Sequence, residues 1–430
     1  MKYVLLLIKL MLFPILVFAQ QLEFFGYYEP QLMAAKIEND FYQLASNKLR
    51  VDLELDASDH VFFRANFNYI TYHGKTKWDI LNFLPEKTVR EIPNLTLLGF
   101  NINPYVLLFN DRQFLDNAFV RLSFKWADLT IGKQQLSMGT GYVWNPTDVF
   151  NQKDVVDPTY EQPGHNAIRL DIPIGSYSGI TAIYAPTDDW KYSDLLVKFK
   201  THVSPFDFSV LAIQKQWKFT DARLFDLMAM DFYQLSTKRR VFGGDFVGEL
   251  FGLGVRGEFT YNNIKIDSDV IFDYQSELQN FYNQLLPTST PPNPMEIKDE
   301  YYEIVLGMDY TFDFQTYIMC EFYRNTFADD NQENYSFNDW IHLLNAETKT
   351  ITRDQIYFLV QHPLTDLIDI SCSSIYSISD QSFGVIPMVS YNIFQNVDLN
   401  FFGNIYFGKE GAAYTKNLGN GGIARARVYF

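Results

Sequence analysis

Charged side chains recur at every second position in several stretches of the sequence. In residues 48–56, Arg50 and Asp52 alternate with Leu49 and Val51. Residues two apart share one face of a strand, so such charges would line one surface. Rows of charged side chains tune the selectivity of an aqueous pore. Closely paired charges could instead form salt-bridge ladders that fill a closed interior, and the sequence leaves both interpretations open.

The candidates for this charged inner surface, and for a constriction within it, are spread over many stretches and one loop. They are Arg50, Arg64, Arg121, Lys133, Gln134, Trp144, Asn145, Asp148, Arg169, Asp245, Arg256, Glu258, Asp309, Glu321, Arg425 and Arg427.

The most distinctive segment is 132–150, where the alternation fails because Lys133 falls in phase with Ile131. Gly139 and Gly141 permit sharp backbone bends, and the following Asn-Pro pair starts a turn. We predict that residues 139–164 fold inward and constrict the enclosed space. The side chains expected nearest to the path are Lys133, Gln134, Trp144, Asn145 and Asp148. An external loop without pore contact is the alternative.

Other chemistry finds little support in the sequence. His202 and Ser204 lie two residues apart, as a hydrolytic pair on one strand face would. They precede Pro205 at a predicted tight turn, and we find no acid that completes a triad there. The histidines lack metal-ligand spacing, and the acidic run 329–333 lacks the ordered spacing of an EF-hand. We therefore predict no catalytic residues, no metal and no cofactor.

Period-two alternation dominates the chain after Gln20. In residues 301–312, Tyr302 and Leu306 share one face, while Glu303 and Asp309 share the other. Alternation over some ten residues is the signature of a strand. Long strands whose apolar face ends in aromatic side chains are typical of transmembrane barrels.

The connections between these strands alternate in length. Tight turns rich in Gly, Pro, Asn, Asp and Ser separate longer polar stretches at 74–112, 140–164, 219–239, 265–299, 327–352 and 409–419. We predict an all-β transmembrane antiparallel barrel of about 18 strands, within a range of 16–20, since apolar runs in 74–112 could add a pair. An even count places both termini on one side, the periplasmic one.

The two cysteines test this count. Cys320 and Cys372 fall on the lipid faces of the thirteenth and fifteenth predicted strands. Two strand spacings are about 9.6 Å, which is beyond the reach of a disulfide. A bond between the two cysteines would therefore overturn the assignment.

Composition and charge narrow the class of protein. Hydrophobic residues make up 47% and aromatic residues 17% of 430 residues, and the mean hydropathy of −0.13 excludes a bundle of membrane helices. The net charge of −16 argues against nucleic-acid binding. Residues 1–19 have the charged start and apolar core of a signal peptide, interrupted by Lys9. The mature domain would be 20–430, exported across a membrane by this signal.

The last strand ends in Arg425-Ala426-Arg427-Val428-Tyr429-Phe430. This ending resembles the C-terminal signature of Gram-negative outer-membrane proteins. In that group the barrel-assembly machinery reads the final aromatic residue, so the resemblance implies this machinery as a partner of Phe430. Arg425 and Arg427 could also pair with Glu23 and Glu29 across the seam where the first strand meets the last.

The segment 132–150 resembles a strand end in porin-like outer-membrane barrels, including the alginate-export group. There a Gly-Arg-Gln strand end leads into a loop folded toward the pore, and here Lys133 replaces the usual Arg. The resemblance covers about twenty residues and implies the barrel class without a substrate. It would place the chain in outer-membrane lipid, where porins are often trimers, although no flat subunit face is visible in the sequence.

We interpret the chain as a porin-like channel for passive diffusion of small polar or charged solutes. No globular plug is expected, since strands begin close after Gln20. The alternative is a barrel whose surface loops bind polysaccharide or a partner protein. An occluded lumen with ordered, ligand-binding loops would favour that alternative.

Overall fold

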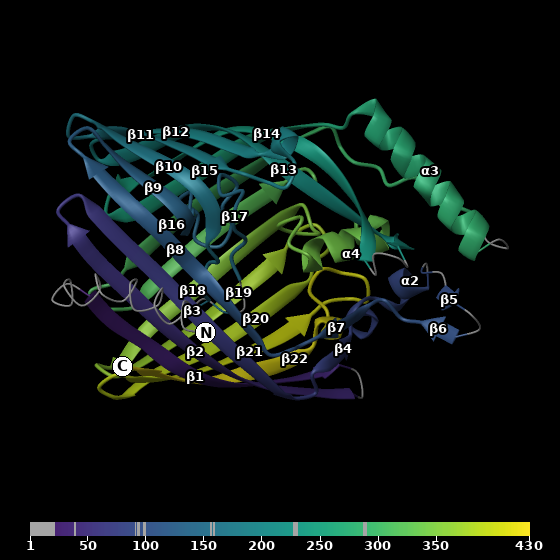
Figure 1. The fold of residues 1–430 in the computed structure, drawn as a ribbon. Coiled ribbons are helices and arrows are strands. Elements are labelled where there is room, and N and C mark those ends of the chain that lie inside the picture. The colour runs from purple at the N-terminus through teal and green to yellow at the C-terminus, as the bar shows by residue number, and fades with distance from the viewer. Residues whose placement is uncertain are drawn as a thin grey trace, which may run out of the picture.

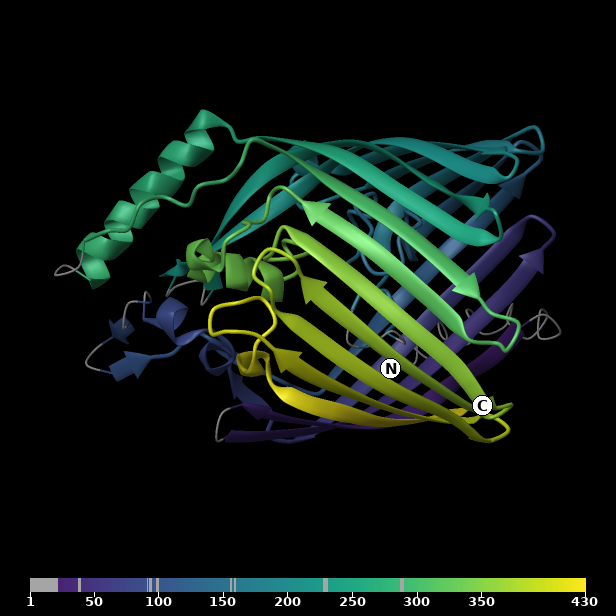
Figure 2. The ribbon, with the colours of Figure 1, turned by 180° about the vertical axis from the view of Figure 1, so that it is seen from behind.

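Eighteen antiparallel strands form one sheet that closes into a barrel (Figures 1 and 2). The computed structural model describes residues 22–37, 40–90, 92, 95–97, 100–154, 157, 160–226, 231–286 and 290–430. The predicted signal peptide, 1–19, lies outside the described residues.

The barrel strands follow the chain order, and each pairs with the next. They are β1 (Leu22–Ile37), β2 (Asp40–Ser58), β3 (Val61–Gly74), β8 (Arg112–Phe124), β9 (Ala127–Gln134), β10 (His165–Ile174), β11 (Ser178–Ala185), β12 (Asp194–Val203), β13 (Phe206–Asp226), β14 (Asp231–Leu250), β15 (Leu253–Lys265), β16 (Glu300–Thr311), β17 (Tyr317–Asn325), β18 (Asp354–Thr365), β19 (Ile368–Ser377), β20 (Phe383–Phe394), β21 (Val397–Phe407) and β22 (Asn420–Tyr429). Pairing of β1 with β22 closes the ring, which confirms the predicted fold class and strand number.

Side chains that alternate along each strand point in turn into the lumen and out to the outer surface of the barrel. On β16, Tyr302 and Leu306 are exposed on the outer surface, whereas Glu303 and Val305 are buried inside. Closure leaves no unpaired sheet edge, so the strand backbone hydrogen bonds are satisfied within the sheet. The polar face of each strand is therefore confined to the lumen.

The two rims of the barrel differ in the length of their connections. At one rim the strands are joined by short turns, such as 59–60 and 251–252, and we call this the turn end. At the opposite rim lie the long connections, including 75–111, 135–164 and 326–353, and we call this the loop end. Leu22, which pairs with Leu55 near the 59–60 turn, and Phe430 both lie at the turn end, where Figures 1 and 2 mark the C-terminus.

One predicted loop is wrong. The stretch 219–239 belongs almost wholly to β13 and β14, which continue beyond the neighbouring strands. Residues of this extension have partners that local sequence does not reveal. Thr220 donates a hydrogen bond through its backbone N–H to Glu347 Oε2 at 2.9 Å, and Asp221 Oδ1 accepts one from Asn338 at 3.0 Å.

The long connections carry the remaining elements. The stretch 75–111 holds α2 (Glu86–Val89) and two small sheets outside the barrel, β4 (Lys77–Asp79) with β7 (Val106–Leu108), and β5 (Leu95–Leu97) with β6 (Phe100–Ile102). The apolar runs predicted to hide strands therefore form strands, but none joins the barrel.

Two longer helices lie at the loop end. In α4 (Phe337–Leu344), a capping box at Ser336 and Asp339 fixes the N-terminus, and Trp340 packs in a cluster with Ala222 of β13. The helix α3 (Ser268–Leu285) packs Tyr274 and neighbouring side chains against β13 and β14 and projects from the rim (Figure 1). Within the described residues, no helix has the length and apolar character needed to cross a membrane.

The cysteines lie where the count predicts. Cys320 is on β17 and Cys372 on β19, with β18 between them, and both are free thiols. The assignment to the thirteenth and fifteenth strands is confirmed.

Candidate functional site: a loop across the lumen

The connection from β9 to β10, residues 135–164, turns into the barrel instead of outward. Two glycines permit this path. Gly139 has a φ of +82°, and a Cβ on it would come within 2.4 Å of the Glu258 carboxylate. A Cβ on Gly141 would overlap the carbonyl oxygen of Trp144. Glycine is therefore required at 139 by the close approach of the backbone to the wall, and at 141 by the tight turn of the loop on itself.

The carboxylate of Glu258 on β15 holds the beginning of this loop. It accepts hydrogen bonds from the backbone N–H of Thr140, from Gly141 N at 2.6 Å, and from Thr147 N at 3.0 Å. The hydroxyl of Thr147 donates a further bond at 2.8 Å. Glu258 is buried, and a buried carboxylate needs several such donors to offset its lost hydration.

Glu321 on β17, two strands further round the barrel, holds the loop in the same way. It accepts hydrogen bonds from the backbone of Tyr142, from Val143 N at 2.8 Å, and from Trp144 N at 3.0 Å. The indole of Trp144 stacks on Tyr323 of β17, with ring centroids 5.0 Å apart. Residues 139–147 are thus fixed to the β15–β17 wall.

The loop is also tied internally and from the loop end. Asp148 accepts backbone bonds from Phe150 N at 3.0 Å and Asn151 N at 3.1 Å. From the connection between β17 and β18, Lys349 donates to the carbonyl oxygens of Asn145 and Asp148. Burial lowers the pKa of Lys349, although nearby acids, Glu303 and Asp148 first, act in the opposite sense.

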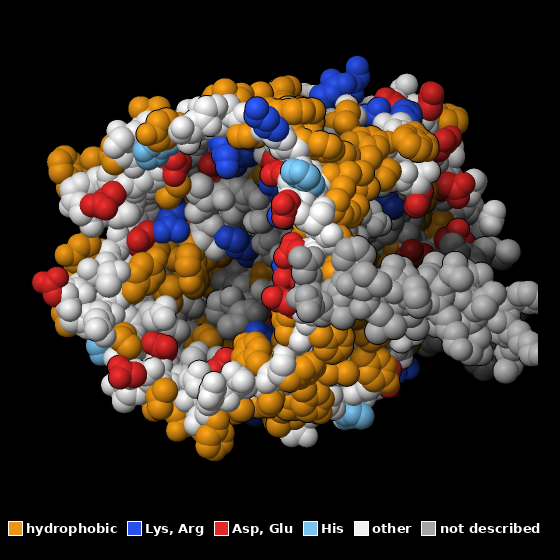
Figure 3. All heavy atoms as spheres, turned by 60° about the vertical axis from the view of Figure 1, so that its left-hand side comes forward, with side chains coloured by type: hydrophobic (Ala, Val, Ile, Leu, Met, Phe, Trp, Pro, Cys, Tyr) orange, Lys and Arg blue, Asp and Glu red, His pale blue; other side chains and the backbone are white. Residues whose placement is uncertain are grey.

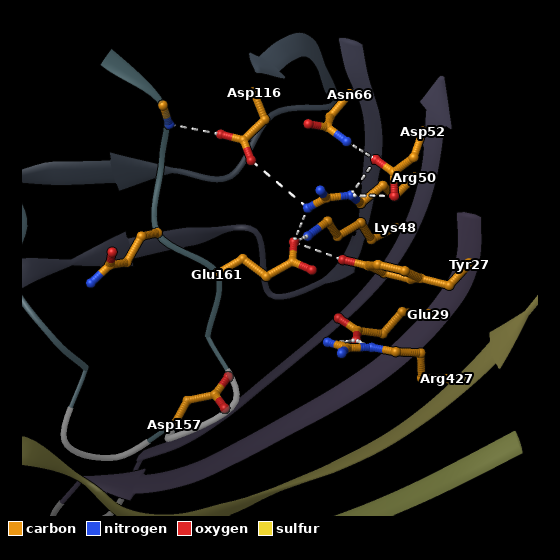
Figure 4. A network of polar contacts seen from close by, with 12 residues as sticks. Tyr27, Glu29, Lys48, Arg50, Asp52, Asn66, Asp116, Asp157, Glu161 and Arg427 are labelled. Carbon is orange, nitrogen blue, oxygen red and sulfur yellow. Dashed lines mark hydrogen bonds and ion pairs between the residues drawn. The ribbon is translucent and has the colours of Figure 1, made fainter. Parts of the chain in front are cut away.

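The later residues of the loop reach the wall formed by β1 and β2 (Figure 4). Glu161 accepts hydrogen bonds from Lys48 at 2.8 Å, from Arg50 at 2.7 Å and from the Tyr27 hydroxyl at 2.8 Å. Burial would raise the pKa of Glu161, but Lys48 and Arg50 outweigh it and lower the pKa to about 2. Asp116 of β8 accepts a further bond from Gly164 N at 3.1 Å.

The seam between β1 and β22 makes one more contact with the loop. Arg425 of β22 donates to Asp157 of the loop at 3.2 Å and to Gln31 of β1 at 2.9 Å. Its neighbour Arg427 pairs with Glu29 of β1 across the seam. The predicted seam pairing is therefore present at Glu29, whereas Glu23 is exposed at the turn end.

The strand order shows that these contacts lie on opposite walls. Counted round the barrel, β2 is the second and β15 the eleventh of 18 strands, so nine strand positions separate them either way. A loop fixed to both spans the whole width of the lumen. The prediction that residues 139–164 fold inward agrees with these contacts, and the alternative of an external loop does not.

Solved structures of similar fold were found by comparison. OccAB4 of Acinetobacter baumannii has a TM-score of 0.53 and 10% sequence identity, over 95% of this chain and 97% of that chain. OccAB1 of the same organism has a TM-score of 0.53 and 11% identity, over 95% and 96%. OccD1 (OprD) has a TM-score of 0.52 and 8% identity, over 95% and 94%.

The fold is a closed, porin-like β-barrel. No protein-family model and no curated protein sequence matches the chain. At these identities the likeness concerns the fold alone, so the chemistry of the lumen must be read from this chain's own residues.

A polar cavity of about 480 Å³ lies inside the porin-like barrel, along the wall from β2 to β12. Its cationic lining side chains are Arg50, Arg64, Arg121, Arg169 and Lys200, and its carboxylates are Asp128 and Asp171. Viewed obliquely from the turn end, the molecule is hollow, with Lys and Arg side chains visible inside (Figure 3). Five of the predicted inner-surface residues, the four arginines and Gln134, thus meet at one cavity.

The lining charges differ in their partners. Arg169 pairs with Asp171 at 2.7 Å, and Arg64 pairs with Glu54 at 3.1 Å. Arg121 lies over the rings of Phe62 and Phe119. Among the described residues, neither Arg121 nor Lys200 forms an ion pair, so the cavity keeps cationic groups whose charge no carboxylate neutralises.

Other predicted residues take part in contacts within the protein. Trp144, Asn145 and Asp148 are almost fully buried and line a small cavity of about 40 Å³ beside Lys349. Asp245 accepts from Lys198 at 3.0 Å, and Arg256 pairs with Asp309.

The placement of Lys133 departs from the prediction. It lies in phase with the exposed Ile131 and donates to the carbonyl oxygen of Leu115 at 2.8 Å, on the outer surface. The alternation fails because β9 ends directly after it, at Gln134, and the chain then turns inward.

Sequence reasoning missed Lys48, Glu161 and Lys349. Lys48 has the same strand parity as Arg50, and this signal could have found it. The two others lie in irregular connections, where no periodicity marks a residue. The pair His202–Ser204 lies at the turn end as predicted, and His202 contacts Asp207 at 2.8 Å. That this protein has no enzymatic activity stays a prediction.

Proposed function

We propose that the protein is an outer-membrane channel through which small charged solutes diffuse passively, with a preference for anions. One observation carries the proposal. Among the described residues, five Arg and Lys side chains and two carboxylates line the cavity of about 480 Å³ inside the barrel. One of the carboxylates, Asp171, already accepts from Arg169 and from Thr181 at 2.6 Å.

The side chains that line this cavity have a net positive charge, whereas the whole chain has a net negative charge. The net charge of −16 would favour cations if it were spread along the path. The selectivity of a pore depends instead on the groups that border its narrow region. Excess arginine and lysine there stabilise an anion and repel a cation, so we expect anions to pass more readily.

The outer surface supports a membrane location. Large apolar side chains such as Leu306, Met308 and Phe401 are exposed on the outside of the strands, as lipid-facing residues of a barrel are. In the proposed orientation the turn end faces the periplasm and the loop end faces outward. Export by the 1–19 signal and recognition of Phe430 by the assembly machinery belong to the same proposal.

The experiment is a planar-bilayer recording of the refolded protein. We expect stable ohmic steps, and under a potassium chloride gradient a reversal potential of the sign that chloride preference gives. A heat-modifiable, folded barrel that passes no current would contradict the channel. A reversal potential of cation sign would contradict the anion preference alone.

Two double variants, which remove the same charge from different places, distinguish the effect of charge in the lumen from the effect of the total charge. Arg121→Gln with Lys200→Gln removes the two lining cations that form no ion pair among the described residues. Arg90→Gln with Lys409→Gln removes the same charge from connections at the loop end. We expect the first pair alone to shift the reversal potential toward cations.

A second candidate function rests on a separate cavity. About 460 Å³ of space at the loop end is lined by Phe327 and Phe337 together with polar groups such as Asn338 and Asp339. Aromatic faces beside hydrogen-bonding groups suit a saccharide, as a barrel that binds polysaccharide would need. Retention on immobilised polysaccharide by a barrel without conductance would favour this function over the channel.

A further inference from the structure

A group of basic side chains lies on the outer wall at the loop end of β14 and β15. Lys238 and Arg240 of β14 have the same parity as Phe242, which is exposed on the outer surface. Lys265 ends β15 with the parity of Phe259, which is also exposed outside. These three cations therefore face outward, away from the lumen and its cavity.

The register places like charges side by side. Lys238 is the direct partner of Lys265 in the antiparallel pair, and Arg240 is the partner of Asn263. Side chains opposite one another have Cβ atoms about 5 Å apart, and like charges at this distance destabilise the pair. Among the described residues no carboxylate forms an ion pair with Lys238, Arg240 or Lys265. The repulsion between Lys238 and Lys265 is therefore not relieved by an ion pair of either residue.

A fourth cation and one carboxylate complete the group. Lys191, in the connection before β12, pairs with Asp267 at 2.9 Å. Lys191 lowers the pKa of Asp267, and Lys238 and Lys265 act in the same direction. The four side chains border one cavity. The group has four cations for one acid. A cavity of about 210 Å³ lies among them.

Tyr192 and Glu300 make contacts with residues that line this cavity. The ring of Tyr192 lies under Lys191 at 5.3 Å and under Lys238 at 5.8 Å. At the other side, Glu300 of β16 is held by Asn263 at 3.3 Å. The ammonium and guanidinium groups thus border an open space on the outer surface.

The apolar surface begins directly below this space. Phe242 pairs with Tyr261, and Gly244 pairs with Phe259, and the three aromatic side chains are exposed. Moving from the loop end toward the turn end, the outer face changes from cations to aromatic rings within one step of the same strands. A ligand that fits both regions has an anionic head and a hydrocarbon tail.

We propose that Lys191, Lys238, Arg240 and Lys265 bind the phosphate of an anionic lipid headgroup in the outer leaflet. Arginine and lysine donate charge-assisted hydrogen bonds to phosphate oxygens, and the acyl chains of the lipid lie on Phe242 and Phe259. The bound phosphate supplies the anion that relieves the repulsion between Lys238 and Lys265. This site depends on the barrel being in a membrane and is independent of solute passage.

The test is native mass spectrometry of the full barrel in a non-ionic detergent, titrated with phosphatidylglycerol. The variant is Lys238→Ala, Arg240→Ala and Lys265→Ala together. Each basic residue near a lipid surface contributes about 1 kcal/mol, so we expect roughly a hundredfold weaker binding of the first lipid in the variant. Phosphatidylcholine, which has no net charge, should bind both proteins equally and weakly.

A matched control keeps the same change of charge elsewhere. Lys87→Ala, Arg90→Ala and Lys409→Ala remove three cations from connections at the loop end, and this variant should bind phosphatidylglycerol like the parent. Equal binding by the parent and the outer-wall variant would overturn the proposal.

Competition with inorganic phosphate distinguishes a lipid headgroup from a free anion as the ligand. It should displace phosphatidylglycerol only at a large molar excess, because it lacks acyl chains. Displacement at equal concentration would assign the site to a free anion and overturn the lipid. Heat-modifiability of each variant checks that it is folded, and the single variant Lys265→Gln, with one charge removed, should show an intermediate loss.

Discussion

Glu258 and Glu321 are carboxylates buried inside a barrel, yet within the described chain neither forms an ion pair. Their partners are backbone N–H groups of residues 140–147 and the hydroxyl of Thr147. Backbone donors are available only if the loop takes one conformation. The two side chains therefore specify the path of the loop, and the free width of the lumen follows from them indirectly.

Replacing Glu258 with Gln should loosen the loop without unfolding the barrel. A glutamine has one acceptor oxygen where the carboxylate has two, and its amide would face N–H donors. We expect a loss of about 2–4 kcal/mol in loop docking, seen as faster proteolysis between residues 139 and 150 and as noisier single-channel current.

The matched control for this variant is Asp245→Asn. Asp245 is also a buried wall carboxylate, but its partners are Lys198 and Ser209 on the wall itself. Equal loop proteolysis in the two variants would mean that Glu258 has no special role in holding the loop.

At the scale of elements, both ends of the loop 135–164 are fixed to the barrel wall. One end is held by neutral donors around Glu258 and Glu321, and the other by the charges around Glu161 (Figure 4). At the second end the contacts are ion pairs of Glu161 with Lys48 and Arg50, which are lost when Glu161 is protonated.

The Glu161 end should be released by acid. Its pKa is lowered from 4.5 to about 2 in the folded protein. A lowered pKa means that the stabilisation is fully present above pH 4.5 and is lost as the pH falls through about 2. Single-channel recordings over this range should show increasing flicker. Glu161→Gln should flicker at neutral pH already, and an unchanged pH response in this variant would contradict the assignment.

Removing the loop should widen the channel. Deletion of 142–160 takes away the segment that crosses between opposite walls, while β9 and β10 stay paired through seven residue pairs. We expect a clear rise in single-channel conductance with a retained heat-modifiable barrel. Unchanged conductance in a folded deletion variant would rule out this loop as the constriction.

The sequence allowed the strands and their faces to be predicted, because alternation is a local property. The strand number, the inward side of Glu303 and the positions of both cysteines follow from it. The extension of β13 was missed because its support is non-local. Thr220 has its partner Glu347 127 residues away, and no spacing in the chain signals that contact.

The same limit applies to the site. Alternation places Glu258 and Glu321 on the inner face, but it does not say what they contact. Their partners on the loop are 111 to 118 and 177 to 179 residues distant. Glycines at 139 and 141 signalled a bend, and the direction of the bend depends on those distant carboxylates.

At the scale of the whole molecule, closure rests on the pairing of β1 with β22. Leu32 lies directly opposite Ala424, and Tyr28 lies directly opposite Val428. Closure satisfies the backbone of the first and last strands and brings Arg427 to Glu29. Without it both strands would expose an edge to lipid.

A cross-link tests this seam. In a background with Cys320→Ser and Cys372→Ser, the pair Leu32→Cys with Ala424→Cys should form a disulfide under mild oxidation. The pair Leu32→Cys with Val428→Cys should not, because four residues along a strand span about 13 Å. Formation of both bonds, or of neither, would contradict the register of the seam.

The route of the loop has a consequence for the order of assembly. The loop follows the fifth barrel strand, whereas Glu258 and Glu321 reside on the eleventh and thirteenth, and Arg425 on the last. During synthesis and insertion the loop thus precedes every one of these anchors. A half-built barrel can hold the Glu161 end of the loop on β1 and β2, but the path across the lumen can be completed only when the final strand is in place. The lumen should therefore narrow at the end of biogenesis, after the wall has closed.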